Sequence, residues 1–147
     1  MRFFRKKPPW YAAGLAFECA RCGNCCAGPI EGYVWVSPAD IAAIARDLGI
    51  SQAEVSKKYV RRVGRRFSLI ERDGNNDCIF LVGDGQGGRQ CRIYRVRPTQ
   101  CRTWPFWKSN LRSPASWAAA GMRCPGINTG PLVTSDEIEA LANQTSE

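Results

Sequence analysis

The 147-residue chain contains no histidine. This absence excludes Cys2His2 and Cys3His zinc sites, Rieske-type ligation and histidine-based catalysis. A phosphate-binding loop is also missing, because the glycine-rich segment 83–88 lacks the Lys-Ser/Thr pair that must follow it. No apolar stretch approaches the roughly 20 residues of a transmembrane helix. Any soft metal ion bound by this chain must therefore be held mainly by sulfur.

A secretion signal is not evident either. Residues 1–7 are basic, but Pro8 and Pro9 follow, and the apolar stretch 10–17 runs directly into a cysteine-rich segment. A cleavage site after that stretch would cut into the cysteines themselves. We therefore predict a cytoplasmic protein with reduced thiols. The alternative is a set of disulfides, which would require an oxidising compartment.

Cysteine is what the chain has in excess. Four cysteines form a C-x2-C-x2-C-C run and four follow singly: Cys19, Cys22, Cys25, Cys26, Cys78, Cys91, Cys101 and Cys124. Four thiolates complete one tetrahedral zinc site or one iron–sulfur cluster, so eight thiols suffice for two sites. The competing interpretation is that some cysteines are small buried apolar residues.

The spacing of the run suggests how the cysteines divide. Residues two apart in such a run can turn their sulfurs toward one centre, whereas neighbours in an extended chain point to opposite sides. We therefore expect Cys25 and Cys26 to serve different centres. One site would combine three cysteines of the run with one remote cysteine, and Cys26 would join three remote cysteines in the other. The sequence leaves this partition open.

The remaining signals predict short elements. Ser37 and Pro38 begin a helix that Gly49 ends, and Ser51 begins a second helix. We expect strands at 30–36, 67–71, 78–82, 89–96 and 117–124, a packed loop or short helical turn at 97–107, and a last helix at 136–143. The prediction is an α+β fold, a small single domain with short antiparallel strands and three or four short helices organised around cysteine metal sites. Residues 1–16 would be a basic lead-in, and 17–147 the cysteine-cluster domain.

The formal charge of +8 raises the question of nucleic acid. Six positive charges fall within ten residues: Lys57, Lys58, Arg61, Arg62, Arg65 and Arg66. A contact with nucleic acid or an acidic partner is one interpretation, but a solvated helix end is favoured. Eight coordinating thiols would lose eight protons, and two zinc ions or two oxidised clusters would restore only half of that charge. The sequence therefore argues against nucleic acid as the partner.

Several motifs together resemble a known family. They are Phe17 to Cys26 (FECARCGNCC), Cys78 to Leu81, Cys91 to Tyr94, Arg97 to Phe106 (RPTQCRTWPF) and Cys124 to Gly126. This set is similar to the CxxCxxCC (YkgJ-type) cysteine-cluster family and includes all eight cysteines. The resemblance implies a zinc- or iron-chelating domain. A flagellin lysine N-methylase is a distant relative, which implies iron–sulfur as the alternative to zinc.

The residues around Cys101 have two interpretations. Arg97 and Arg102 could donate hydrogen bonds to thiolate or sulfide, or they could pair with Asp77 or Glu71 or simply be solvated. Trp104, Phe106 and Trp107 could shield a metal centre from water, although packing in an ordinary core is favoured.

We therefore predict a metal-binding protein whose eight cysteines hold zinc or an iron–sulfur cluster, in a structural or electron-transfer role with an electron-transfer or protein partner. One alternative is an iron–sulfur-dependent enzyme related to lysine N-methylases. Another is a module that binds nucleic acid or an acidic partner. The sequence shows no nucleophile–base pair and no methyl-donor motif, so catalytic residues stay unassigned.

Overall fold

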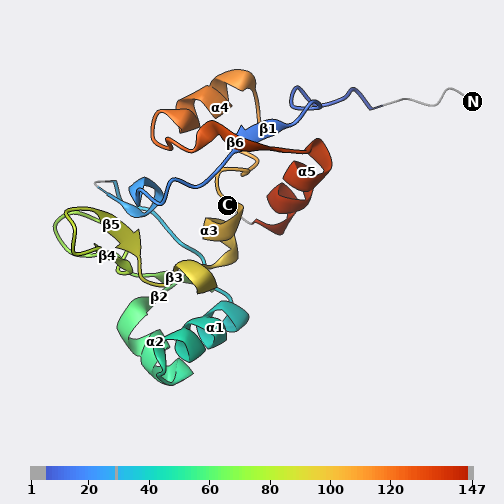
Figure 1. The fold of residues 1–147 in the computed structure, drawn as a ribbon. Coiled ribbons are helices and arrows are strands. Elements are labelled where there is room, and N and C mark those ends of the chain that lie inside the picture. Colours follow the sequence, from blue (N-terminus) through green and yellow to red (C-terminus); the bar gives the residue numbers. More distant parts are fainter. Residues whose placement is uncertain (1–5, 29, 146–147) are drawn as a thin grey trace, which may run out of the picture.

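The computed structural model describes residues 6–28 and 30–145 and has an α+β fold (Figure 1). Its elements are β1 (Leu15–Phe17), the 3-10 turn η1 (Asn24–Cys26), α1 (Pro38–Leu48), α2 (Gln52–Tyr59), β2 (Val60–Val63), β3 (Arg66–Leu69), β4 (Leu81–Gly83), β5 (Arg89–Cys91), η2 (Tyr94–Val96), α3 (Thr99–Thr103), α4 (Pro114–Gly121), β6 (Ile127–Val133) and α5 (Ser135–Gln144). The strands pair antiparallel in three two-stranded ribbons, β1–β6, β2–β3 and β4–β5. The predicted fold class is confirmed, with five α-helices in the described residues.

One hydrophobic core lies under α1 and α2, the two helices at the lower end of Figure 1. Ser37 begins α1 as predicted, because its hydroxyl accepts a hydrogen bond from the Asp40 amide while the Asp40 carboxylate accepts one from the Ser37 amide. The helix presents Ile44 to the core, where Val55 of α2 is also fully buried. The core consists of Val36, Ile41, Ile44, Ala45, Val55, Leu69, Phe80 and Ile93.

A second, separate core lies at the opposite end of the molecule (Figure 1), between α4, α5 and the β1–β6 ribbon. Phe106 lies at its centre, with its ring edge-on to Phe17 and stacked on Trp117. Thr134 caps α5 by accepting a hydrogen bond from the Glu137 amide. The core consists of Phe106, Leu111, Trp117, Ala120, Ile127, Ile138 and Ala142.

Two predicted strands are wrong. Residues 117–124 lie mostly in helix α4, which Ser113 begins in the same way as Ser37 begins α1, by accepting from an amide three residues on. In segment 30–36 only Trp35 forms a strand-like bridge, with Ser68 of β3. A further hydrogen bond from the Leu69 amide to the Val34 carbonyl keeps this segment beside β3 without making it a regular strand.

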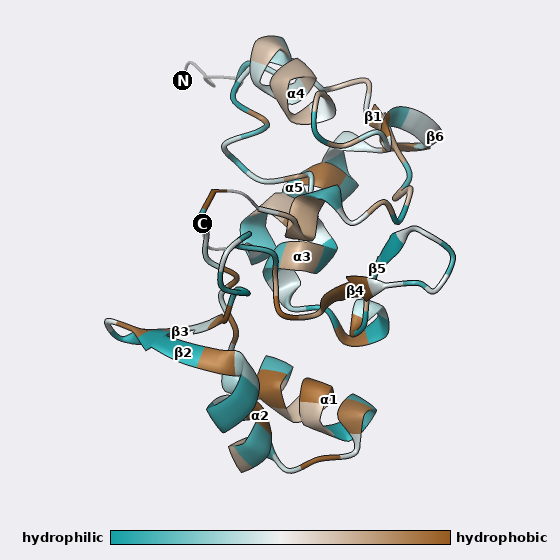
Figure 2. Ribbon diagram, turned by 90° about the vertical axis from the view of Figure 1, so that its left-hand side faces the viewer, coloured by the Kyte–Doolittle hydropathy of each residue, from teal (hydrophilic) through white to brown (hydrophobic). Residues whose placement is uncertain are grey.

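The basic segment is also not a helix end. Lys57 and Lys58 close α2, but the four arginines lie on the β2–β3 hairpin, which turns at Gly64 and Arg65. Figure 2 shows this hairpin projecting from the side of the molecule as a largely hydrophilic ribbon.

The β4–β5 hairpin forms as predicted but is shorter. Its register pairs Leu81 with Cys91, so Cys78 precedes the ribbon and bridges instead to Glu71.

The cysteine-bearing segments connect the two cores. Cys78 and Cys91 pack against the first core, and Cys124 packs against the second. Helix α3, which carries Cys101, lies between the two groups of helices (Figure 1). No helix among residues 6–28 and 30–145 combines the length and apolarity needed to cross a membrane.

Candidate metal centre

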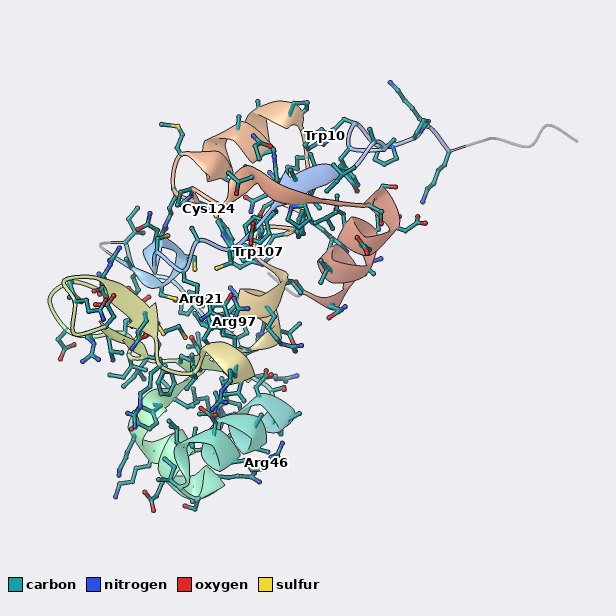
Figure 3. The ribbon with its side chains drawn as sticks, in the orientation of Figure 1. Trp10, Arg21, Arg46, Arg97, Trp107 and Cys124 are labelled. Atoms are coloured by element: carbon teal, nitrogen blue, oxygen red, sulfur yellow. The ribbon has the colours of Figure 1, made fainter. Side chains whose placement is uncertain are left out.

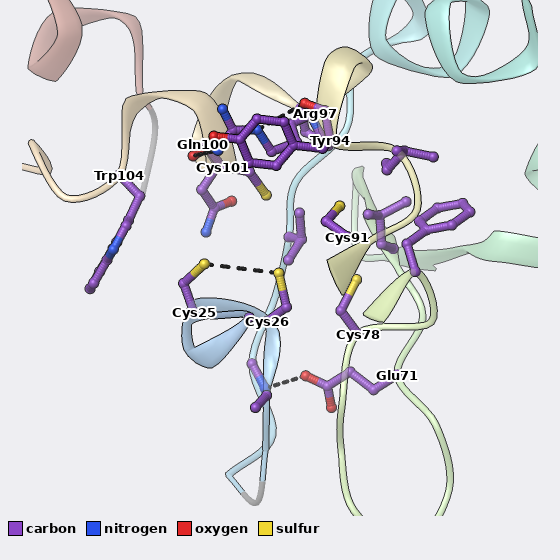
Figure 4. A pocket seen from close by; sticks show the side chains of 18 of the residues that line it. Cys25, Cys26, Glu71, Cys78, Cys91, Tyr94, Arg97, Gln100, Cys101 and Trp104 are labelled. Carbon is purple, nitrogen blue, oxygen red and sulfur yellow. Dashed lines mark hydrogen bonds between the residues drawn. The ribbon is translucent and has the colours of Figure 1, made fainter. Parts of the chain in front are cut away.

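A cavity of about 560 Å³ opens where the cysteine-bearing segments meet. Six of the eight cysteines line it: Cys19, Cys25, Cys26, Cys78, Cys91 and Cys101. Figure 4 shows the sulfurs of the last five facing the same space, although they come from four separate segments of the chain. All eight thiols are free of disulfide bonds.

The local fold of the run brings two of these sulfurs together. Residues 24–26 form a tight 3-10 turn rather than an extended strand, with Gly23 before it at a φ of +77°, in the left-handed region. The sulfurs of Cys25 and Cys26 consequently lie 3.9 Å apart and both line the large cavity. The extended-chain argument that predicted their divergence does not hold in this turn.

Hydrogen bonds from distant segments hold the turn in place. The Asn24 side chain accepts from Arg89 of β5 at 2.8 Å and donates to the Arg123 carbonyl at 2.9 Å. The Arg123 guanidinium in turn donates to the carbonyl oxygens of Asn24 and Ala27. Asn24 therefore connects the run to both halves of the molecule, a role that no sequence signal indicated.

The other lining cysteines are fixed by their backbones. The Cys78 amide donates to the Cys26 carbonyl at 2.8 Å, which ties the first single cysteine to the end of the run. Cys91 ends β5, and Cys101 lies on α3 with its amide bonded to the Pro98 carbonyl. A short helical turn at Cys101 was one of the two predicted forms for this segment.

The thiols influence one another strongly. A hydrogen bond with Cys26 lowers the pKa of Cys25 to about 6 and that of Cys91 to about 7, with burial opposing and the Arg97 cation assisting in both cases. The same two hydrogen bonds raise the pKa of Cys26, which acts as the donor. Burial raises the pKa of Cys78 to about 11, and it also raises that of Cys101. This group of thiols thus favours binding a cation, because a cation allows all of the thiols to ionise together.

Positive charge lies next to the sulfurs. The guanidinium groups of Arg97 and Arg21 both lie over the Tyr94 ring, at 3.9 and 4.1 Å from its centre, and all three residues line the cavity. Figure 3 shows Arg21 and Arg97 close together in the middle of the molecule. Arg97 is fixed by donating to the Tyr94 and Cys101 carbonyls. The alternative interpretation, in which Arg97 or Arg102 pairs with Asp77 or Glu71, finds no such ion pair among the described residues.

A much smaller cavity, of about 30 Å³, is lined by the two remaining cysteines, Cys22 and Cys124. Cys19 and Cys25 also line it, and these two cysteines therefore border both cavities. Three positions of the C-x2-C-x2-C run thus border the same space as one remote cysteine.

The aromatic residues after Cys101 divide between two roles. Phe106 is buried in the second core, as expected, whereas Trp107 lines the large cavity and Trp104 lines both. The Trp107 indole donates to the Gln100 carbonyl at 2.9 Å.

The donor set fits a soft metal or a cluster. Cysteine sulfurs dominate it, and the nearby cations compensate thiolate charge. As the side chains stand, no group of three or more cysteine, aspartate or glutamate side chains within the described ranges is arranged to hold a single ion. Side-chain rotation, or a bound group larger than one ion, would be needed to bring them onto a common centre.

Comparison with known proteins agrees with this chemistry. The family model CxxCxxCC, described as "Putative zinc- or iron-chelating domain", matches residues 18–125. The chain is 38% identical over 96 residues to "Uncharacterized protein MJ0661" of Methanocaldococcus jannaschii, a match that covers 65% of this chain and 48% of that protein. The chain therefore spans about half the length of this relative. No solved structure matches the chain.

Proposed function

The chain belongs to the CxxCxxCC family, and from that premise we propose that it is an iron–sulfur protein whose large cavity holds a cluster through Cys26, Cys78, Cys91 and Cys101. The observation that carries this proposal is the gathering of thiols from four separate segments around one cavity. Cys19, Cys22, Cys25 and Cys124 would then form a second all-sulfur site beside the smaller cavity.

The size of the large cavity favours a cluster over a single ion. A zinc ion needs little room, because four sulfurs close around it at about 2.3 Å. A space of about 560 Å³ whose sulfurs do not converge on one point suits a larger inorganic group better. When bound, a cluster would supply one-electron chemistry. The chain itself would supply thiolate ligands, the Arg97 and Arg21 cations that offset their charge, and the indoles that exclude water.

Zinc is the second candidate, and one distance favours it. In a tetrahedral zinc site with sulfur at about 2.3 Å, neighbouring sulfurs are separated by about 3.8 Å. The sulfurs of Cys25 and Cys26 already lie 3.9 Å apart, so in this version the two cysteines would bind the same zinc ion and the division given above for a cluster would not apply. In that case the centre would be redox-silent and would stabilise the fold.

The other two alternatives gain no support. On the basic hairpin, Arg61 and Arg66 lie over the rings of Tyr33 and Trp35, and Arg61 also pairs with Glu31 at 3.3 Å. These contacts give Arg61 and Arg66 a role within the fold, and no feature of the cavity favours methyl transfer.

Metal analysis of protein purified without oxygen tests the proposal. A brown protein that contains iron and acid-labile sulfide supports the cluster, whereas a colourless protein with stoichiometric zinc supports the second candidate. Cys78→Ser should remove the metal bound in the large cavity, and Cys124→Ser should remove the metal bound at the smaller one. The two variants should therefore lose different shares of the total metal. Protein that binds neither metal after anaerobic reconstitution would contradict both versions.

A further inference from the structure

Trp104 has a buried hydrogen-bond donor that meets no acceptor among residues 6–28 and 30–145. Its indole Nε1 is inaccessible to solvent and has no hydrogen-bond partner within the described part of the chain. An unpaired buried donor costs about 1–3 kcal/mol, so native proteins rarely keep one without a reason.

Other tryptophans of the chain are satisfied by the protein itself. The indole of Trp10 donates to the Leu111 carbonyl at 2.7 Å, that of Trp107 to the Gln100 carbonyl at 2.9 Å, and that of Trp117 to Asn128 Oδ1 at 3.1 Å. The fold is thus able to provide an acceptor for a buried indole, and at Trp104 it does not.

The position of Trp104 indicates what the missing acceptor is. Its side chain lines both cavities, and Figure 4 shows it on the Cys25 side of the large one. The neighbouring Trp107 ring meets it edge-on, with 4.8 Å between the ring centres, which restricts its rotation. Both spaces are also bordered by Cys19, Cys25, Arg21 and Gly23. Among their side chains only the two cysteine sulfurs can accept a hydrogen bond, most strongly when ionised, whereas the indole only donates.

We propose that Trp104 Nε1 donates a hydrogen bond to a sulfur of the bound centre, either a cysteine thiolate or an inorganic sulfide. Trp104 is then a positioning residue that tunes the metal, and this role rests on the function proposed above. A hydrogen bond to sulfur stabilises the more negative state of a cluster and raises its reduction potential. Trp104 also lines both sulfur-lined cavities, so it can influence both centres.

The test replaces Trp104 with phenylalanine, which removes the N–H and keeps an aromatic ring. Iron and sulfide contents of wild type and W104F are measured first, after reconstitution with ferrous iron and sulfide, so that the presence of the cluster is established independently. The midpoint potential is then followed by optical titration. We expect the equilibrium between oxidised and reduced cluster in W104F to shift about tenfold toward the oxidised form. This corresponds to a midpoint potential lower by about 59 mV for a one-electron couple.

W117F is the matched control, because Trp117 is a buried tryptophan of the second core that lines neither cavity. Its midpoint potential should equal that of the wild type. The control thus separates the effect of losing the Trp104 N–H from that of losing core packing in general. Equal potentials in the wild type and W104F would overturn the proposal.

A second readout keeps the proposal testable if the protein binds zinc and no cluster. In protein labelled with ¹⁵N-tryptophan, the indole N–H signal that disappears in W104F identifies Trp104. Zinc loading should move this signal downfield and slow its exchange with water. A signal that zinc loading leaves unmoved would overturn the hydrogen bond, even though zinc binding itself had been demonstrated.

Discussion

Arg97 is placed to influence the affinity of the cysteine sulfurs for a metal. Its guanidinium lines the large cavity, lies over Tyr94 and is held by the Tyr94 and Cys101 carbonyls. Four thiolates around one centre carry more negative charge than a divalent ion or an oxidised cluster removes. A fixed cation beside them therefore lowers the electrostatic cost of filling the site.

Arg97→Gln should weaken metal binding by about 10–100-fold, the range found when a partner of a metal ligand is removed. Competition with a chelator of known affinity measures this change. Arg95→Gln is the control, because Arg95 pairs with Asp47, is 88% exposed and does not line the cavity. Equal losses in the two variants would mean that total charge matters and that the position of Arg97 does not.

At the level of elements, the junction of β1 and β6 depends on one close approach. The Glu18 amide, just after β1, donates to the carbonyl of Gly126, just before β6. A Cβ at Gly126 would lie 2.1 Å from the Glu18 carbonyl oxygen, and backbone cannot rotate away as a side chain can. This contact keeps the segments of Cys19 and Cys124 together, and both residues line the smaller cavity.

Gly126→Ala should therefore lower the free energy of unfolding by about 1–3 kcal/mol, as overpacking does. It should also remove metal from the smaller site while the larger one stays filled. Urea denaturation and metal analysis measure the two effects. Gly83→Ala is the matched control, since the nearest atom to its Cβ would be 4.0 Å away. A G126A protein with unchanged metal content would show that the junction does not support the site.

The elements also show where sequence patterns were sufficient. Helix α1 was predictable because Ser37, Pro38 and Asp40 act locally, within one turn. Ser113 and Pro114 give the same signal before α4, but the β-strand interpretation of 117–124 took no account of it.

The pairing of β2 with β3 depends on a two-residue turn inside a run of charges, where charge masked the strand pattern. The approach of Cys25 to Cys26 depends on a 3-10 turn held by Asn24, and contacts nearly 100 residues apart in sequence fix that turn.

On the scale of the whole molecule, two hydrophobic cores meet through a junction whose cavity is lined by six cysteines, four arginines and two tryptophans among other residues. Neither core is large, and small cores stabilise a fold only marginally. Cys78 and Cys91 pack against the first core, and Cys101 lies on α3 between the two cores. A metal centre bound by these three cysteines would stabilise the junction in place of apolar contacts. Metal binding would then contribute directly to the stability of the assembled molecule.

Removal of the metal should therefore loosen the junction before it unfolds the cores. Hydrogen exchange measured by mass spectrometry on loaded and chelated protein should show lost protection at residues 19–26 and 97–103. Helices α1 and α5 should keep most of theirs, because Ile44 and Ile138 remain fully buried in separate cores. The melting temperature should fall on chelation and recover when the metal is restored. Uniform loss of protection would mean that neither core folds without the metal, and unchanged protection at the junction would mean that the metal does not join them.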